Sequence, residues 1–128
     1  MPLLAPISWG ELLDKITILE IKSERLTSPT ALMNVRHELE LLSGIADGVA
    51  DDRGKLPALK TTLKKVNGEL WTIEDRIRAK EANQLFDREF VELARSVYRN
   101  NDRRGRLKRE INLLLGSELI EEKQYAPY

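Results

Sequence analysis

The chain has 128 residues, 21 lysines and arginines, 21 aspartates and glutamates, a formal net charge of zero and no cysteine. This length is that of one domain that can fold without cross-links. The lack of cysteine excludes disulfides and thiolate metal sites, and the zero net charge excludes a global field that would attract nucleic acid or an anionic membrane. Charged residues at 33% with aromatics at 5% are typical of helices with solvated outer faces. We therefore expect one all-α domain over residues 1–128.

The expected location is the cytoplasm. No run of about 18 apolar residues exists that would cross a membrane. The first residues, 1–6, lack the basic region and the apolar length of a signal peptide. We expect no contact with a membrane.

The first helix is expected over about residues 9–26. Ser8 is in the N-cap position and Glu11 follows three residues later, which is the pattern of a capping box. Two sides of the helix are apolar, with Leu12, Leu13, Ile16 and Leu19 on one and Ile18 and Ile21 roughly opposite. Such a helix is covered on both sides, by sister helices or by a second subunit. Contacts with a second subunit are expected at Trp9, Ile18, Ile21 and Trp71.

The second helix is expected over about residues 29–47, because Ser28 and Pro29 form a cap followed by a first-turn proline. Its apolar stripe comprises Leu32, Val35, Leu39, Leu42 and either Ile45 or Ala46. Glycines at 44, 48 and 54 indicate a connecting loop of about ten residues, which is the candidate internal linker.

Two longer helices are expected over about residues 56–82 and 88–115. The first has a coiled-coil-like seam, made by Leu56, Leu59, Leu63, Val66, Leu70, Ile73 and Ile77. Asp87 caps the second helix and Gly116 ends it. The short turn between them predicts an antiparallel hairpin, with the two earlier helices packed on it as a bundle of about four helices. Residues 117–128 form an acidic tail of uncertain structure.

A polar break interrupts the apolar face of the last helix. Its inward arc reads Phe90, Leu93, Ala94, Val97, Asn101, Arg104, Lys108, Ile111 and Leu115. Cations that face a helical core need carboxylates, water or an anionic ligand. Glu20, Asn67 and Glu74 fall within the inward arcs of other helices, and we expect the two glutamates to pair with the cations.

Three interpretations of this polar set remain open. The first is an internal salt-bridge network that fixes helix register. The second is a pocket for an anionic ligand, and the third is a set of long side chains that reach solvent. As a pocket, it would use Glu20, Asn67, Glu74, Asn101, Arg104 and Lys108.

Other functional signals are weak. The basic run 99–109 lacks stacking aromatics apart from Tyr98, so a role as a nucleic-acid accessory ranks third. His37 is the one histidine, so no second histidine stands at metal-ligand spacing and we expect no metal site. No Walker loop, nucleophile elbow or dinucleotide fingerprint is present, and we expect no cofactor.

The leading functional hypothesis is therefore a non-enzymatic interaction or scaffold protein that self-associates or binds a protein partner. The alternative is a small-molecule binder or enzyme that holds an anionic ligand at Arg104, Lys108 and Glu20.

Several segments resemble a family of short bacterial proteins of unknown function. They are 8–22, Val66-Asn67, Leu70-Trp71, 73–75, 93–98, Asn101-Asp102, Leu107-Lys108, Ile111-Asn112, 121–123 and Tyr125. This resemblance implies a single helical bacterial domain and brings no activity. The polar interior is also similar in type to that of all-helical chorismate mutases, which hold a dicarboxylate between helices. The motif spacing differs, so no catalytic residue is transferred.

Overall fold

The computed structural model describes residues 1–49, 51 and 54–128, which fold into four α-helices. They are α1 (Trp9–Arg25), α2 (Pro29–Ala46), α3 (Leu56–Ala82) and α4 (Arg88–Leu114). The described residues contain no strand. The all-α class is confirmed, and each helix begins and ends within a residue of its predicted bounds. Part of the predicted linker, residues 50, 52 and 53, lies outside the described residues.

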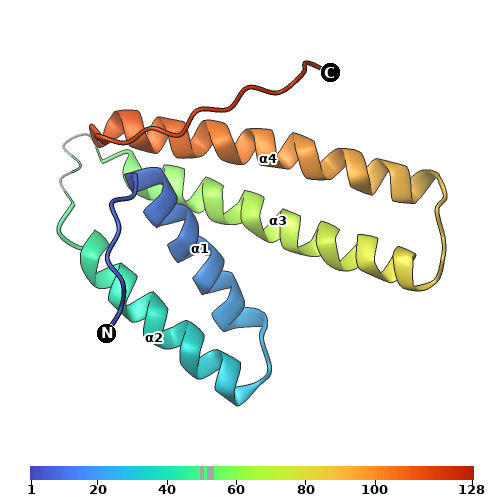
Figure 1. Cartoon of the computed structure of the whole chain (residues 1–128), viewed down its shortest axis with the longest axis horizontal. Helices are drawn as coiled ribbons and strands as arrows, with labels where there is room; N and C mark the ends of the chain where they lie inside the picture. Colours follow the sequence, from blue (N-terminus) through green and yellow to red (C-terminus); the bar gives the residue numbers. More distant parts are fainter. Residues whose placement is uncertain (50, 52–53) are drawn as a thin grey trace.

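The helices form two hairpins of unequal length (Figure 1). The longer one is the predicted antiparallel pair of α3 and α4, which share the most extensive packing. The shorter one pairs α1 with α2, and α1 is the helix that joins the two hairpins because it packs on both α3 and α4. Within the described part of the chain, α2 packs on α1 alone, so the prediction that both earlier helices pack on the longer hairpin was wrong for α2.

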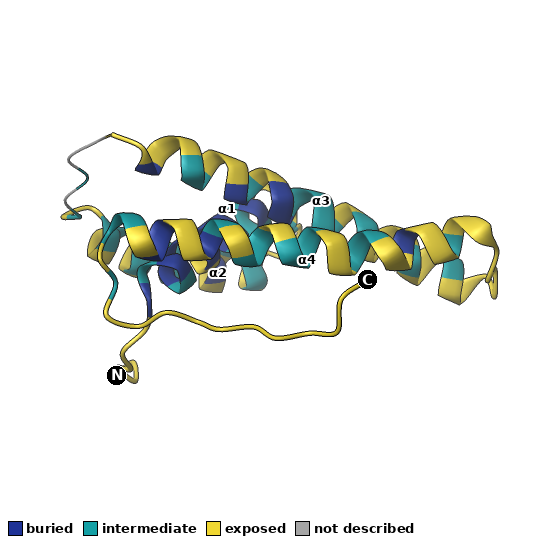
Figure 2. Ribbon diagram, turned by 90° about the horizontal axis from the view of Figure 1, so that it is seen from above, coloured by how far each residue is buried: buried dark blue, intermediate teal, exposed yellow. Residues whose placement is uncertain are grey.

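The core lies where α1 crosses the longer hairpin. Its buried side chains are Leu12, Leu13 and Ile16 of α1, Leu56 and Leu63 of α3, and Ile111 of α4. Figure 2 shows buried residues gathered at this crossing, while the far half of the hairpin is mostly exposed. We call residues 56–70 with 101–114 the root of the hairpin, and residues 71–100 the arm. The root therefore carries the fold, and the arm extends past it.

Both apolar sides of α1 are covered by sister helices. Leu19 and Ile21 are each only 4% exposed, although they lie on different sides of α1. On α2, Ala46 rather than Ile45 continues the stripe, because Ile45 is 60% exposed. On α4, Ala94 is exposed although the periodicity placed it on the inward arc.

Candidate functional site

A buried ion pair joins α1 to α4 at the root. Arg104 Nε donates to Asp14 Oδ1 at 2.8 Å, and Arg104 Nη2 donates to Asp14 Oδ2. The Asp14 side chain is 2% exposed and that of Arg104 is 28% exposed. The hydrogen bonds to Asp14 raise the pKa of Arg104. Such a two-pronged contact fixes the guanidinium in one orientation.

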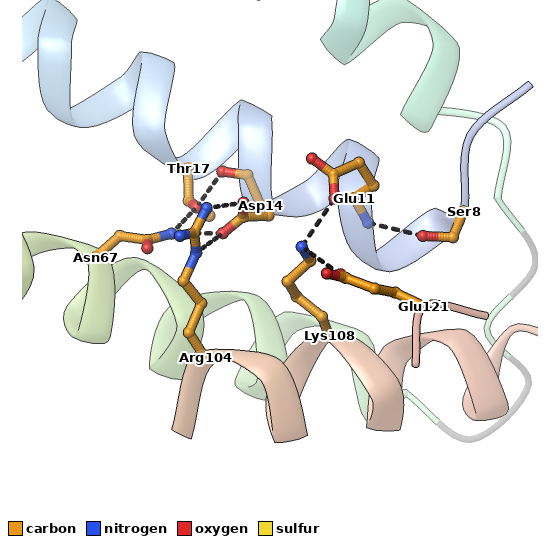
Figure 3. Close-up of polar contacts among 8 residues, drawn as sticks. All are labelled: Ser8, Glu11, Asp14, Thr17, Asn67, Arg104, Lys108 and Glu121. Carbon is orange, nitrogen blue, oxygen red and sulfur yellow. Dashed lines mark hydrogen bonds and ion pairs between the residues drawn. The ribbon is translucent and has the colours of Figure 1, made fainter. Parts of the chain in front are cut away.

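Polar side chains from α1 and α3 complete the environment of Asp14 (Figure 3). Asn67 Nδ2 donates to Asp14 Oδ1 and to Thr17 Oγ1, each at 3.0 Å. Thr17 Oγ1 in turn donates to the backbone carbonyl of Asp14 at 2.8 Å. The buried carboxylate thus has donors from two other helices, which is the condition under which a buried charge is tolerated.

Lys108 lies one helical turn further along α4 and has two carboxylate partners. Its Nζ lies 2.7 Å from Glu11 Oε2 and 3.0 Å from Glu121 Oε2, while its side chain is 9% exposed. Burial lowers the pKa of Lys108, but the hydrogen bonds to the two glutamates outweigh burial and raise it. Glu11 therefore turns toward α4, and not back to the Ser8 backbone as a full capping box requires.

The start of α1 is held directly against α4. Gly10 N donates to Asn112 Oδ1 at 2.6 Å, and a Cβ added at Gly10 would lie 2.4 Å from the Lys108 carbonyl oxygen. Ser8 Oγ accepts from Glu11 N at 3.1 Å, which confirms the predicted cap. Ser117 Oγ accepts from Trp9 N at 3.3 Å. Three side chains thus satisfy amides at the start of α1 that a helix leaves without partners.

The predicted partners of the two cations were wrong. Glu20 Oε2 lies 3.6 Å from Lys60 Nζ, and Glu74 Oε2 lies 3.4 Å from Arg78 Nε on the exposed arm. Six residues separate Glu20 from Asp14, which turns the glutamate about 120° away around α1. The actual partners are Asp14 for Arg104, and Glu11 and Glu121 for Lys108.

The sequence contained a signal for Asp14 that periodicity in hydrophobic residues misses. Gly10, Asp14 and Thr17 recur at spacings of four and three, so they share one face of α1. Small and polar residues on one face of a helix permit close approach to another helix. Asp14 is absent from the candidate residues because its face of α1 is marked by small and polar residues and not by hydrophobic ones.

A groove of about 640 Å³ opens beside the Asp14–Arg104 pair, between α1, α3 and α4. Seven of the ten candidate residues from the sequence line it: Ile18, Ile21, Asn67, Trp71, Glu74, Asn101 and Arg104. Lys22, Leu70, Asp75, Arg78 and Val97 complete the lining. The volume falls within the range of small-molecule sites, roughly 300–1,000 Å³.

The other three candidate residues lie elsewhere. Lys108 is occupied by Glu11 and Glu121, and Glu20 faces Lys60. Trp9 packs against the core cluster. The residues predicted to bind a ligand and those predicted to form a subunit interface therefore line one groove, except for Lys108, Glu20 and Trp9.

The groove is polar in two distinct stretches. Near the root, it presents Asn67, Asn101 and Arg104. Further out on the arm, it presents Glu74, Asp75 and Arg78 from α3. Arg25 stacks on Trp71, with its guanidinium carbon 5.9 Å from the ring centroid, so one face of this indole is covered. A ligand would meet the groove-lining part of Trp71 that Arg25 leaves open.

The basic run 99–109 is largely paired with acids. Arg103 Nη1 lies 3.3 Å from Glu69 Oε2 and Arg109 Nη1 lies 2.9 Å from Glu122 Oε1, in addition to the pairs of Arg104 and Lys108. These cations therefore contact α1, α3 and the tail, and do not form one free stripe for phosphates.

The described part of the chain offers neither a metal site nor a membrane-spanning helix. Over residues 1–49, 51 and 54–128, no three metal-ligating side chains cluster, and His37 is exposed on α2. No helix in this part of the chain combines the length and apolarity that a membrane crossing needs.

Comparison with known proteins gives a family and no activity. No curated protein and no solved structure matches the chain. A family model does match, over residues 3–127, and its description is a family of unknown function, DUF6165. The chain belongs to this family.

Proposed function

We propose that this DUF6165 protein binds a small organic carboxylate with an apolar body in the groove between α1, α3 and α4. One observation carries the proposal: residues selected from the sequence for two separate reasons line a single groove of about 640 Å³. A concave site with an apolar wall and a few convergent polar groups is the usual form of a small-molecule site.

Arg104 is the group that favours a carboxylate. A guanidinium carries five N–H donors, and two of those of Arg104 are directed to Asp14. Its side chain is 28% exposed and lines the groove, so other donors can reach a ligand. Because Asp14 fixes the guanidinium beforehand, little side-chain entropy is lost when a second carboxylate binds. Asn101 adds an amide donor, and Lys22 adds positive charge.

The apolar part of the ligand has a matching wall. Ile18 and Ile21 line the groove from α1, Leu70 and Trp71 from α3, and Val97 from α4. Ile21 is already buried, so a ligand would cover the solvent-facing parts of the other four side chains. This stabilises the complex in proportion to the apolar area removed from water. Recognition would thus combine an oriented carboxylate with a buried apolar body.

Self-association and a cytoplasmic location stay predictions. The lack of cysteine is compatible with the cytoplasm. The residues first assigned to a subunit interface support a ligand site better, because Ile18, Ile21 and Trp71 line the groove.

The test is a thermal-shift screen with aromatic and branched-chain monocarboxylates, each run beside its primary amide. A ligand at 100 times its dissociation constant adds about 2.7 kcal/mol of stability. Asn101→Ala is the groove variant, and Asn100→Ala is its matched control. Asn100 is adjacent on α4, lies outside the groove, and donates to Ser96 O at 2.9 Å.

We expect carboxylates to stabilise the wild type and Asn100→Ala. The affinity of Asn101→Ala for the same carboxylates should be at least tenfold lower. Equal binding by both variants would place the ligand outside the groove. A screen in which no carboxylate shifts the wild type would contradict the proposal.

A further inference from the structure

The C-terminal tail, residues 117–128, runs back along α4 in an extended form (Figure 1). Glu121 and Glu122 contact Lys108 and Arg109 at 3.0 and 2.9 Å. At the end of the chain, Tyr128 Oη donates to Asp102 Oδ2 at 2.5 Å. The tail therefore covers the outer face of α4.

Aromatic contact complements these charges. The rings of Tyr98 and Tyr128 meet edge to face, with centroids 4.8 Å apart. The hydrogen bond to Asp102 raises the pKa of Tyr128. The outer face of α4 thus offers two kinds of contact. Its basic groups pair with acidic side chains, and the ring of Tyr98 together with the carboxylate of Asp102 holds a tyrosine.

The attachment of the tail is weak for its length. Residues 118–128 are all exposed, so they bury little apolar surface. The exposed ion pair of Glu122 with Arg109 stabilises the structure only slightly, and Glu121 is itself 47% exposed although its partner Lys108 is buried. Every ordered residue of the tail, in contrast, loses backbone entropy. We expect the tail to leave and return to α4 readily.

The tail also does not fill or neutralise its own site. A furrow of about 1140 Å³ remains between the tail and α4. Its α4 wall includes Arg106, which forms no ion pair within the described ranges of the chain. The furrow has room and positive charge for a segment that is bulkier or more acidic than the tail.

We propose that the outer face of α4 is a docking surface for an extended acidic segment of a partner protein that carries an aromatic side chain. The chain's own tail occupies this surface until the partner displaces it. A tethered segment acts at a high effective concentration, and the fraction of uncovered chains scales the apparent affinity of a partner. The tail thus sets a threshold that a partner segment must exceed.

The experiment measures the binding of a labelled peptide with the sequence of residues 117–128 by fluorescence anisotropy. Three forms of the protein are compared. One is the wild-type full chain, and the other two, which we call the opened chains, are a chain that ends at Ser117 and a full chain with Glu121→Gln, Glu122→Gln and Tyr128→Ala. The substituted full chain keeps the test valid if the shortened chain does not fold. A second peptide carries Gln in place of Glu118, Glu121 and Glu122.

We expect the peptide to bind either opened chain at least tenfold more tightly than it binds the wild type. The Gln peptide should bind at least tenfold more weakly, and salt should weaken binding. In the opened chain, Arg106→Glu should reduce binding tenfold. Arg95→Glu is the matched control because Arg95 lies on the same helix but outside the furrow, and it should leave binding unchanged.

Several results would overturn the proposal. They are equal binding by wild-type and opened chains, no binding by either opened chain, and equal binding of the two peptides. Sedimentation of the wild type provides one more. A dimer that disappears when the tail is removed would make the occupant a second copy's tail, and not a segment of a different protein.

Discussion

The root and the arm of the α3–α4 hairpin contain the same kinds of ion pair in different surroundings. At the root, Arg104 meets Asp14, whose side chain is 2% exposed. On the arm, Arg76 meets Glu89, and the two side chains are 57% and 50% exposed. Water and salt screen the exposed pair, whereas the buried one is screened far less. The surroundings of an ion pair, more than its geometry, decide what it contributes.

On the arm, hydrogen bonds between charged groups shift pKa values without a matching gain in stability. Hydrogen bonds to Asp87 and Glu89 raise the pKa of Lys80, and hydrogen bonds from Lys80 lower the pKa of both carboxylates. Lys80 thereby links the last turn of α3 to the first turn of α4. The two carboxylates are about half exposed, at 49% and 50%, and only Lys80 is mostly covered, at 16%. We expect these contacts to guide the turn locally and to add little to global stability.

The largest effect is expected for Arg104→Ala at the root. The substitution leaves the Asp14 carboxylate buried without its cation, which costs about 3–5 kcal/mol. Urea unfolding of the variant beside the wild type measures the loss. A cost below about 1 kcal/mol would mean that water or another group replaces the guanidinium.

A somewhat smaller loss is expected for Gly10→Ala, about 1–3 kcal/mol. The new Cβ would lie 2.4 Å from the backbone oxygen of Lys108, so α1 must shift away from α4. Gly44→Ala on α2 is the control, because no atom lies within 4 Å of its added Cβ. The control should gain about 0.5–1 kcal/mol. A neutral Gly10→Ala would show that the close approach of α1 and α4 is not needed.

Acid should release the tail while the root remains folded. The hydrogen bond from Lys108 lowers the pKa of Glu121. The contact is therefore fully formed above the ordinary glutamate pKa of about 4.3 and is lost as the pH falls through the lowered value. Backbone NMR signals of residues 118–128 report the release, and those of α1 serve as the control. Tail signals that change no more than those of α1 over the whole acid titration would contradict this linkage.

The smallest effect is expected on the arm. Arg76→Ala removes an exposed ion pair with Glu89, and the free energy of unfolding should not change measurably. The same urea experiment as for Arg104→Ala provides the comparison. An equal loss for the two variants would remove the distinction between root and arm.

The fold was predictable because strong local signals coincide with the helix ends. Ser8, Ser28 and Asp87 each cap the helix they were predicted to cap. The seam of α3 and the two apolar sides of α1 required partners, and α1 found them in the other three helices. These features depend on neighbours in sequence, which is the information that periodicity reads.

The site was only partly predictable, since it depends on which faces meet. Asn67, Asn101 and Arg104 were identified as inward polar residues, and the structure brings them together. Asp14, the partner of Asn67 and Arg104, was missed because its face of α1 carries Gly10 and Thr17, a signal that hydrophobic periodicity does not read. Glu121 was missed because the path of an irregular tail leaves no periodic pattern.

The most direct test of this account is a double-mutant cycle on Asp14→Leu and Arg104→Met, with unfolding free energies from urea titration. We predict a coupling energy of about 2–3 kcal/mol, with the double variant more stable than the sum of the single losses implies. Additive single losses, each below about 1 kcal/mol, would show that this pair does not hold α1 on the root. The groove would then lose the fixed guanidinium on which its proposed function depends.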